Sequence, residues 1–216
     1  MADTTATPST ASTGSPAAKY RKWLVPGIIL GVLLLLVLWF IGSYNSLVGQ
    51  REDVQKTFAN LQGQYQRRAD LVPNLVSTVK GAANFEQETL TQVTEARAKA
   101  TSVTIDPSKA TPQQLQQYQQ SQGELSQALG RLLAVSENYP QLTATQNFKD
   151  LQVQLEGTEN RIAVARKDYN DVSASYNAHV KRFPTVIVAG ISGFDAFPYF
   201  QAEQGAQNAP SVNFGE

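Results

Sequence analysis

Apolar and bulky positions recur at alternating intervals of three and four residues through most of the chain after residue 44. The first stretch includes Leu47, Val54, Phe58 and Val72. This spacing is typical of a helix that packs along neighbouring helices. Pro73 interrupts the pattern, and Asp70 could serve as an N-cap just before it. We therefore predict two helices here, at about 44–69 and 71–101.

Two further stretches show the same spacing. Thr111-Pro112-Gln113-Gln114 offers an N-cap, a proline at the first helical position and a capping-box glutamine. The apolar pattern that follows is predicted to end at Pro140. The last helix is predicted over Phe148 to Phe183, before Pro184. Long helices joined by short loops favour antiparallel neighbours, so residues 44–182 are predicted to form an up-and-down four-helix bundle in an all-α chain.

An intensely apolar run precedes this region. Eighteen consecutive residues, Leu24 to Ile41, carry no charged or polar side chain, and as a helix they would be about 27 Å long, close to the thickness of a bilayer core. Residues 23–43 are therefore expected to form a single transmembrane helix. A cleavable signal peptide and a buried core helix are the alternatives, although the run is longer than the apolar part of a usual signal peptide.

The sequences on either side of the run differ in charge. Lys19, Arg21 and Lys22 precede it, whereas the first cation after it is Arg51. The positive-inside rule then places the N-terminus in the cytoplasm and the predicted bundle outside. Residues 1–22 are dominated by Ala, Thr, Ser, Pro and Gly before this basic flank, so they are expected to be a disordered tail.

Composition excludes several function classes. The chain has no cysteine, a single histidine (His179), and 18 Lys and Arg against 18 Asp and Glu. Thiolate and multi-histidine metal sites are therefore excluded, and the zero net charge argues against a nucleic-acid partner. No motif supplies a nucleophile with its base, and no glycine-rich loop for phosphate is present. We expect no enzyme activity, no cofactor and no metal.

Some polar residues fall where the helices should be apolar. Arg51 and Arg68 lie on the predicted buried stripe, and a buried arginine needs a partner. We predict an interhelical polar network that draws on Arg51, Arg68, Asp70, Arg131, Glu137, Glu159 and Arg161. The alternatives are an anion or peptide site lined by arginines and, less favoured, catalysis by paired carboxylates.

The C-terminal segment, residues 183–216, has no lysine or arginine and is rich in aromatic residues. Phe194, Phe197, Tyr199 and Phe200 make it a predicted interaction tail, because exposed aromatics at this density mark an interaction surface. The tail could lie over the bundle, in the membrane interface or on a partner protein. It is too short to span a bilayer as a helix.

Several ordered blocks give the chain a family resemblance. They include Tyr44-Asn45-Ser46-Leu47-Val48, Arg67 to Val76, Ser126 to Val135, and the repeated Tyr169-Asn170 and Tyr176-Asn177. In these blocks the chain resembles the LemA family of bacterial membrane proteins, over roughly residues 20–214. The resemblance implies one N-terminal anchor and a LemA-like four-helix bundle over 44–182. The resemblance does not indicate a particular biochemical activity, because none is established for the family.

Together these observations predict a non-catalytic scaffold or adaptor of the bacterial cell envelope. It would be a single-pass protein of the plasma (inner) membrane, with the lipid bilayer and either a protein partner or a second copy as its contacts. The alternative is a sensor or regulator that binds a peptide or an anionic ligand in an arginine-lined groove.

Overall fold

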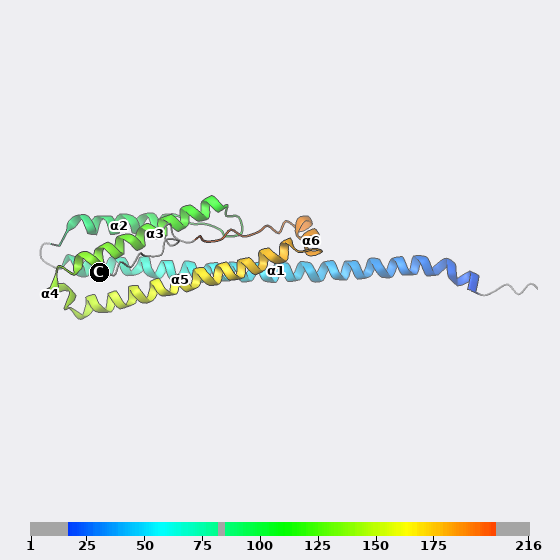
Figure 1. Ribbon diagram of the computed structural model, residues 1–216, viewed down its shortest axis with the longest axis horizontal. Coiled ribbons are helices and arrows are strands. Elements are labelled where there is room, and N and C mark those ends of the chain that lie inside the picture. Colours follow the sequence, from blue (N-terminus) through cyan, green and yellow to red (C-terminus); the bar gives the residue numbers. More distant parts are fainter. Residues whose placement is uncertain (1–16, 82–84, 202–216) are drawn as a thin grey trace, which may run out of the picture. The chain divides into compact units, whose positions relative to one another are not determined.

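The computed structural model describes residues 17–81 and 85–201, and these residues form helices, turns and extended segments without a strand (Figure 1). They divide into two compact units, Met1–Ser43 and Tyr44–Glu216. Helix α1 (Ala17–Lys80) has residues in both. The second unit, called the helical unit below, also holds the helices α2 (Gln87–Ser102), α3 (Pro112–Ser136), α4 (Pro140–Thr143), α5 (Gln146–Lys181) and α6 (Thr185–Ser192). The all-helical prediction is confirmed for the described residues.

The first unit contains the apolar segment of α1. Its large side chains are exposed around the whole circumference, for example Leu30 at 68% and Leu35 at 65%. The segment is long enough and apolar enough to cross a membrane, and a helix that is apolar on all sides is typical of a membrane span. Helix α1 already begins at Ala17, so residues 17–22 are helical where a disordered tail was predicted. The rest of that predicted tail, residues 1–16, lies outside the described residues.

The predicted helix break near Pro73 is wrong, because α1 continues through Pro73 to Lys80. Asp70 is accordingly no N-cap, and it accepts a hydrogen bond from Gln66 Nε2 at 2.8 Å on the exposed surface. Proline cannot donate to the carbonyl four residues earlier, which here belongs to Ala69. That buried carbonyl instead accepts a hydrogen bond from Arg97 Nε of α2, at 2.8 Å. A side chain from the neighbouring helix thus satisfies the acceptor that Pro73 leaves unpaired.

This arrangement predicts coupling between Arg97 and Pro73. Arg97→Ala should lower the free energy of unfolding by about 1–3 kcal/mol, because it leaves a buried carbonyl without a donor. In a Pro73→Ala background, residue 73 regains its N–H and can itself donate to Ala69. The same Arg97→Ala change should then cost clearly less, which a double-mutant cycle measured by denaturant unfolding would detect. Equal costs in the two backgrounds would contradict the proposed substitution of donors.

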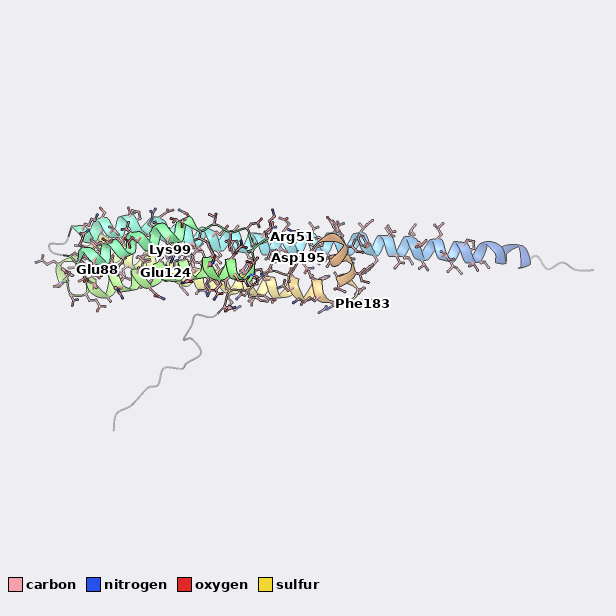
Figure 2. The ribbon with its side chains drawn as sticks, turned by 90° about the horizontal axis from the view of Figure 1, so that it is seen from above. Arg51, Glu88, Lys99, Glu124, Phe183 and Asp195 are labelled. Atoms are coloured by element: carbon pink, nitrogen blue, oxygen red, sulfur yellow. The ribbon has the colours of Figure 1, made fainter. Side chains whose placement is uncertain are left out.

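Helices α2 and α3 lie antiparallel. Lys99 Nζ is 2.6 Å from Glu124 Oε2 (Figure 2), and farther from the connecting loop Arg131 donates to Gln92. The capping box predicted at Thr111 and Gln114 is confirmed, with both reciprocal hydrogen bonds present. Helix α3 ends at Ser136 instead of Pro140. Pro140 begins α4, because proline fits the first turn of a helix better than its interior.

Helices α1 and α5 also run antiparallel. Three contacts between them descend along α5 as they ascend along α1, joining Gln50 to His179, Phe58 to Tyr169 and Arg68 to Glu159. The predicted apolar stripe of α1 is buried along this side, including Leu47, Val54, Phe58, Leu61, Tyr65, Val72, Leu75 and Val79. Apolar side chains of α2, α3, α4 and α5 complete one core with the end of α1.

Candidate functional site

Arg68 is the charged side chain most deeply buried among the described residues, at 1% exposure. Its guanidinium joins α1 to α3 and α5. Nη1 donates to Glu159 Oε1 at 2.9 Å and to Ser126 Oγ at 3.1 Å. Nη2 donates to the side-chain oxygen of Gln122 at 2.8 Å and to its backbone oxygen at 3.0 Å. Four hydrogen bonds to two other helices therefore fix the guanidinium in place.

The two partners of the ion pair differ in their exposure to solvent. The carboxylate partner, Glu159, keeps 39% of its side chain exposed, whereas the side chain of Arg68 keeps 2%. The guanidinium carbon also lies 5.3 Å from the ring centre of Tyr65, a cation–π distance. Nε is buried without a hydrogen-bond partner among the described residues. The ion pair thus replaces the lost hydration of one deeply buried cation, while its carboxylate still contacts water.

Of the residues predicted to form a polar network, the structure brings only Arg68 and Glu159 together. The others have separate contacts. The Arg51 guanidinium lies 6.0 Å from the ring centre of Phe194, and Arg161 donates to Thr158. Arg131 donates to Gln92 and Asp70 accepts from Gln66, both on the exposed surface. Glu137 is exposed at the C-terminal end of α3.

Two residues of the Arg68 network were not identified from the sequence, Gln122 and Ser126 of α3. Gln122 is 6% exposed, and its Nε2 also donates to the backbone oxygen of Ala100 in α2 at 3.0 Å. Through this one glutamine the network reaches a fourth helix. The available signal was its position on the apolar stripe of α3, where a neutral polar residue needs partners as much as an arginine does.

Three of the four aromatic residues predicted to form an interaction tail lie inside the helical unit. Phe194, Phe197 and Phe200 are 5–7% exposed, whereas Tyr199 is 44% exposed. Phe200 packs on Phe58 of α1 and Tyr169 of α5, with ring centres 6.4 and 5.4 Å apart. Residues 194–201 therefore lie over the helices and extend their core, so these three rings are not available to a partner in this state. Residues 202–216 of the predicted tail lie outside the described residues.

Side-chain amides hold this segment by pairing with its backbone. Asn177 donates to the carbonyl of Phe197 and accepts from its N–H, both at 2.8 Å and both buried. Asn170 makes the same pair of bonds with Phe200, at 3.0 Å each. Gln119 of α3 repeats the arrangement with Gln201. These side chains therefore supply the hydrogen-bond partners that a neighbouring strand would give to the backbone of Phe197, Phe200 and Gln201.

A short repeat in α5 encodes this arrangement. Within that helix Tyr-Asn occurs twice, seven residues apart, at Tyr169-Asn170 and Tyr176-Asn177. Residues seven apart lie on the same side of a helix. The tyrosines also serve the segment, since Tyr169 Oη donates to the carbonyl of Pro198 at 3.0 Å and Tyr176 packs on Phe197.

The chemistry of these groups is that of a stabilising network. No three His, Asp or Glu side chains among the described residues are placed to hold a metal ion. Burial raises the pKa of Tyr169 to about 12 and raises the pKa values of Tyr118 and Tyr176. These phenols therefore stay neutral near pH 7 and act as hydrogen-bonding and packing groups, not as bases.

The raised tyrosine pKa values predict alkaline destabilisation. A tyrosine in the unfolded chain ionises near pH 10, whereas Tyr169 does so near 12. Its stabilising contribution is complete below pH 10 and is lost as the pH rises through 12, for a total of about 2–3 kcal/mol. Denaturant unfolding at several pH values should show this fall, and Tyr169→Phe should make it smaller. An equal fall in the Tyr169→Phe variant would contradict the assignment.

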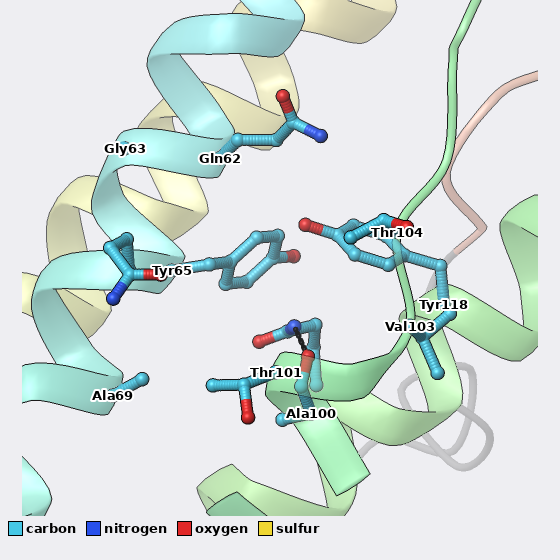
Figure 3. Close-up of a pocket in the computed structure, with 11 residues that line it drawn as sticks. Gln62, Gly63, Tyr65, Ala69, Ala100, Thr101, Val103, Thr104 and Tyr118 are labelled. Carbon is cyan, nitrogen blue, oxygen red and sulfur yellow. Dashed lines mark hydrogen bonds between the residues drawn. The ribbon is translucent and has the colours of Figure 1, made fainter. Parts of the chain in front are cut away.

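A hollow of about 350 Å³ lies beside the Arg68 network. Tyr65 of α1 and Tyr118 of α3 project into it toward one another, and Val103 and Thr104 lie beside Tyr118 (Figure 3). Thr101 also lines the hollow. Gln62, Gly63 and Gln122 complete much of the lining, which contains no charged side chain. The hollow is thus a neutral, polar and aromatic surface, and the arginine-lined groove expected for an anion does not occur there.

The described residues define a class of protein. It is all-helical, has one apolar segment able to cross a membrane, and has a polar network that joins its helices. Residues 57–214 match the model of the LemA family, so the chain belongs to the LemA family. It is 29% identical to magnetosome protein MamQ 2 of Paramagnetospirillum magneticum, over 84% of this chain and 74% of that protein. It is 25% identical to protein LemA of Metamycoplasma hominis, over 82% and 78% of the two chains. These relationships support a membrane-associated protein.

Proposed function

We propose that this protein is a membrane-anchored, non-catalytic scaffold or adaptor of the bacterial cell envelope. The observation that carries the proposal is the state of Arg68. All four of its hydrogen bonds go to groups of α3 and α5, so its charge is used within the fold. A binding or catalytic arginine would instead present donors to a ligand.

The proposed architecture is one transmembrane helix, residues 23–43, followed by an up-and-down four-helix bundle, 44–182. Antiparallel contacts of α1 with α5, and of α2 with α3, support this topology. The contact of Ala69 with Arg97 of α2, and that of Gln62 with Ile105 just after α2, support the same antiparallel relation of α1 and α2. The bundle is the part that would meet partners, because it holds most of the charged residues of the chain.

The proposed location is the bacterial plasma (inner) membrane. The apolar segment of α1 and the membrane-associated LemA family support it. Lys19, Arg21 and Lys22 before the segment favour a cytoplasmic N-terminus, with the bundle outside. Protease treatment of spheroplasts should therefore remove a tag placed after Glu216 while sparing one placed before Met1. The opposite pattern would reverse the orientation.

A second candidate is a sensor or regulator that binds a ligand. The hollow between α1 and α3 supports it, because two tyrosines and several amide and hydroxyl groups meet there. Its neutral lining fits a peptide or another uncharged polar ligand better than an anion.

Photocrosslinking in intact cells separates the two candidates. A photoreactive residue would replace Val153, an exposed residue of α5, or Gln62 in the hollow. A scaffold should form discrete protein adducts from Val153, and these should persist when Gly63→Phe fills the hollow. Gly63 has open space where a Cβ would lie, and Gly130, equally open but outside the hollow, supplies the control variant Gly130→Phe. Adducts formed only from Gln62, and lost with Gly63→Phe, would favour the sensor.

A further inference from the structure

One face of α6 is apolar and uncovered among the described residues. Thr185, Val188 and Ala189 form its buried face. The α6 patch consists of Val186, Ile187 and Ile191 on the opposite side of the helix, with exposures of 44, 51 and 72%, together with Phe183 just before the helix, at 76%. No charged residue occurs from Phe183 to Phe194. A helix that is apolar on all sides is usually buried in protein or in lipid, and an exposed apolar patch marks a surface that is covered in use.

Contacts within the helical unit locate the patch at one end of it. His179, near the end of α5, lies 2.9 Å from Gln50 of α1. Phe194, just after α6, packs on Tyr44 with ring centres 5.5 Å apart. Helix α6 therefore lies at the end of the unit where the chain enters from its apolar segment, and Figure 2 shows Phe183 there, at the outer edge of the unit.

The chain itself links this end to a membrane. Ile41 is the last residue of the apolar run, and Tyr44 follows it three positions later. Three steps along the chain span at most about 11 Å, whatever their conformation. A bilayer that holds the run has its headgroup layer within that distance, because this layer adds about 5–8 Å to each side of the hydrocarbon. With the apolar run in a bilayer, helix α6 would therefore lie close to the headgroups.

The charges around the patch fit a lipid surface. Lys181 and Arg182 directly precede Phe183, and both are exposed. Apolar side chains that enter the acyl boundary beside cations that reach phosphate groups are typical of interfacial helices. Phosphate headgroups therefore complement these cations, while the acyl boundary covers the apolar side chains.

We propose that Phe183 and the outer face of α6 insert into the membrane interface, so that the helical unit has a second contact with the bilayer besides its transmembrane helix. The proposal rests on the membrane anchor described above. Such a lipid contact would give the helical unit a second attachment to the bilayer and so define which of its sides faces the membrane. The adaptor would then present a defined surface away from the lipid.

Fluorescence quenching in the full-length chain tests this proposal. The chain has no cysteine, so single cysteines at Ile187, Val153 and Leu33 can each carry one fluorophore. The protein would be reconstituted in vesicles of three parts phosphatidylcholine to one part phosphatidylglycerol, with quenchers attached near the headgroup or deep in the acyl chains. Val153 is the matched control, since it is 67% exposed and lies about 39 Å from His179 along α5.

The proposal expects the label at Ile187 to lose roughly half of its emission with the shallow quencher, while that at Val153 loses less than about a tenth. The label at Leu33 should respond to the deep quencher. A response at Leu33 without one at Ile187 would overturn the α6 inference and leave the anchor standing. No response at Leu33 would instead remove the anchor. A label at Ile187 that is shielded from water but not quenched by lipid would mean that protein covers the patch, which also overturns the inference.

Discussion

Replacing Arg68 by alanine should lower the free energy of unfolding by about 3–5 kcal/mol, the usual cost of breaking a buried ion pair from one side. The change leaves the side-chain oxygen of Gln122 without this donor in a buried site and removes a second donor from its backbone oxygen. It also removes a large side chain from the junction of α1, α3 and α5. For a chain of this length the loss corresponds to a fall in Tm of about 10 °C.

The adjacent Arg67 provides the matched control. It is exposed on the same helix, so Arg67→Ala should change the free energy of unfolding by less than about 0.5 kcal/mol. Both variants can be compared as full-length protein in detergent, by denaturant unfolding followed with circular dichroism. Glu159→Gln should lie between them, because it keeps an acceptor for Nη1 and removes only a partly exposed charge.

The same series bears on function. If Arg68→Ala folds with nearly unchanged stability, the four hydrogen bonds do not hold the helices together. That result would favour the alternative in which Arg68 binds a ligand. If Arg68→Ala and Arg67→Ala are equally destabilising, the effect comes from helix charge in general. A large loss for Arg68 alone supports the structural role on which the scaffold proposal rests.

Periodicity predicted the helices because their signal is repeated along each segment. The buried stripe of α1 from Leu47 to Val79 follows the predicted spacing, and local chemistry predicted the capping box at Thr111. Such features depend on residues within a few positions of one another. They can therefore be recognised without knowledge of the tertiary structure.

The continuation of α1 through Pro73 could not be predicted in this way. Its local sequence favours a break, and the compensating donor is Arg97, on another helix. Likewise, the sequence indicated that Arg68 needs a partner but not which one. Glu137 and Glu159 were equally suitable carboxylates, and Arg131 was as suitable a cation for either as Arg68, whereas the structure selects Glu159 and adds the neutral residues Gln122 and Ser126. Selection among such partners depends on the register of packed helices, which periodicity does not specify.

The environment of the C-terminal segment also could not be predicted from its sequence. Its aromatic residues indicated a surface that is covered, but not what covers it. The aromatics Phe194, Phe197 and Phe200 enter the core, while Val186, Ile187 and Ile191 of α6 stay exposed. Gly193 makes the turn between these two parts, with a φ of 71° that favours glycine. The two halves of one apolar tail therefore have different environments.

Replacing Asn177 by alanine should release the segment 194–201 and lower the free energy of unfolding by about 2–4 kcal/mol. Two hydrogen bonds disappear, and the N–H and carbonyl of Phe197 lose their partners in a buried site. Each unsatisfied group costs about 1–3 kcal/mol, unless the segment detaches and exchanges with water. Detachment would remove the rings of Phe197 and Phe200 from the core. Hydrogen exchange would measure it directly, as a loss of protection at the Phe197 amide of at least about tenfold.

Two further variants separate this effect from a general weakening of α5. Asn160→Ala changes an exposed asparagine of the same helix, so the Phe197 amide should keep its protection. Asn170→Ala removes the half-buried pair of bonds with Phe200, so protection should fall mainly at Phe200 and less steeply. If Asn177→Ala leaves the Phe197 amide fully protected, packing of the aromatic rings alone holds the segment. The amide pairs would then satisfy polar groups without fixing the position of the tail.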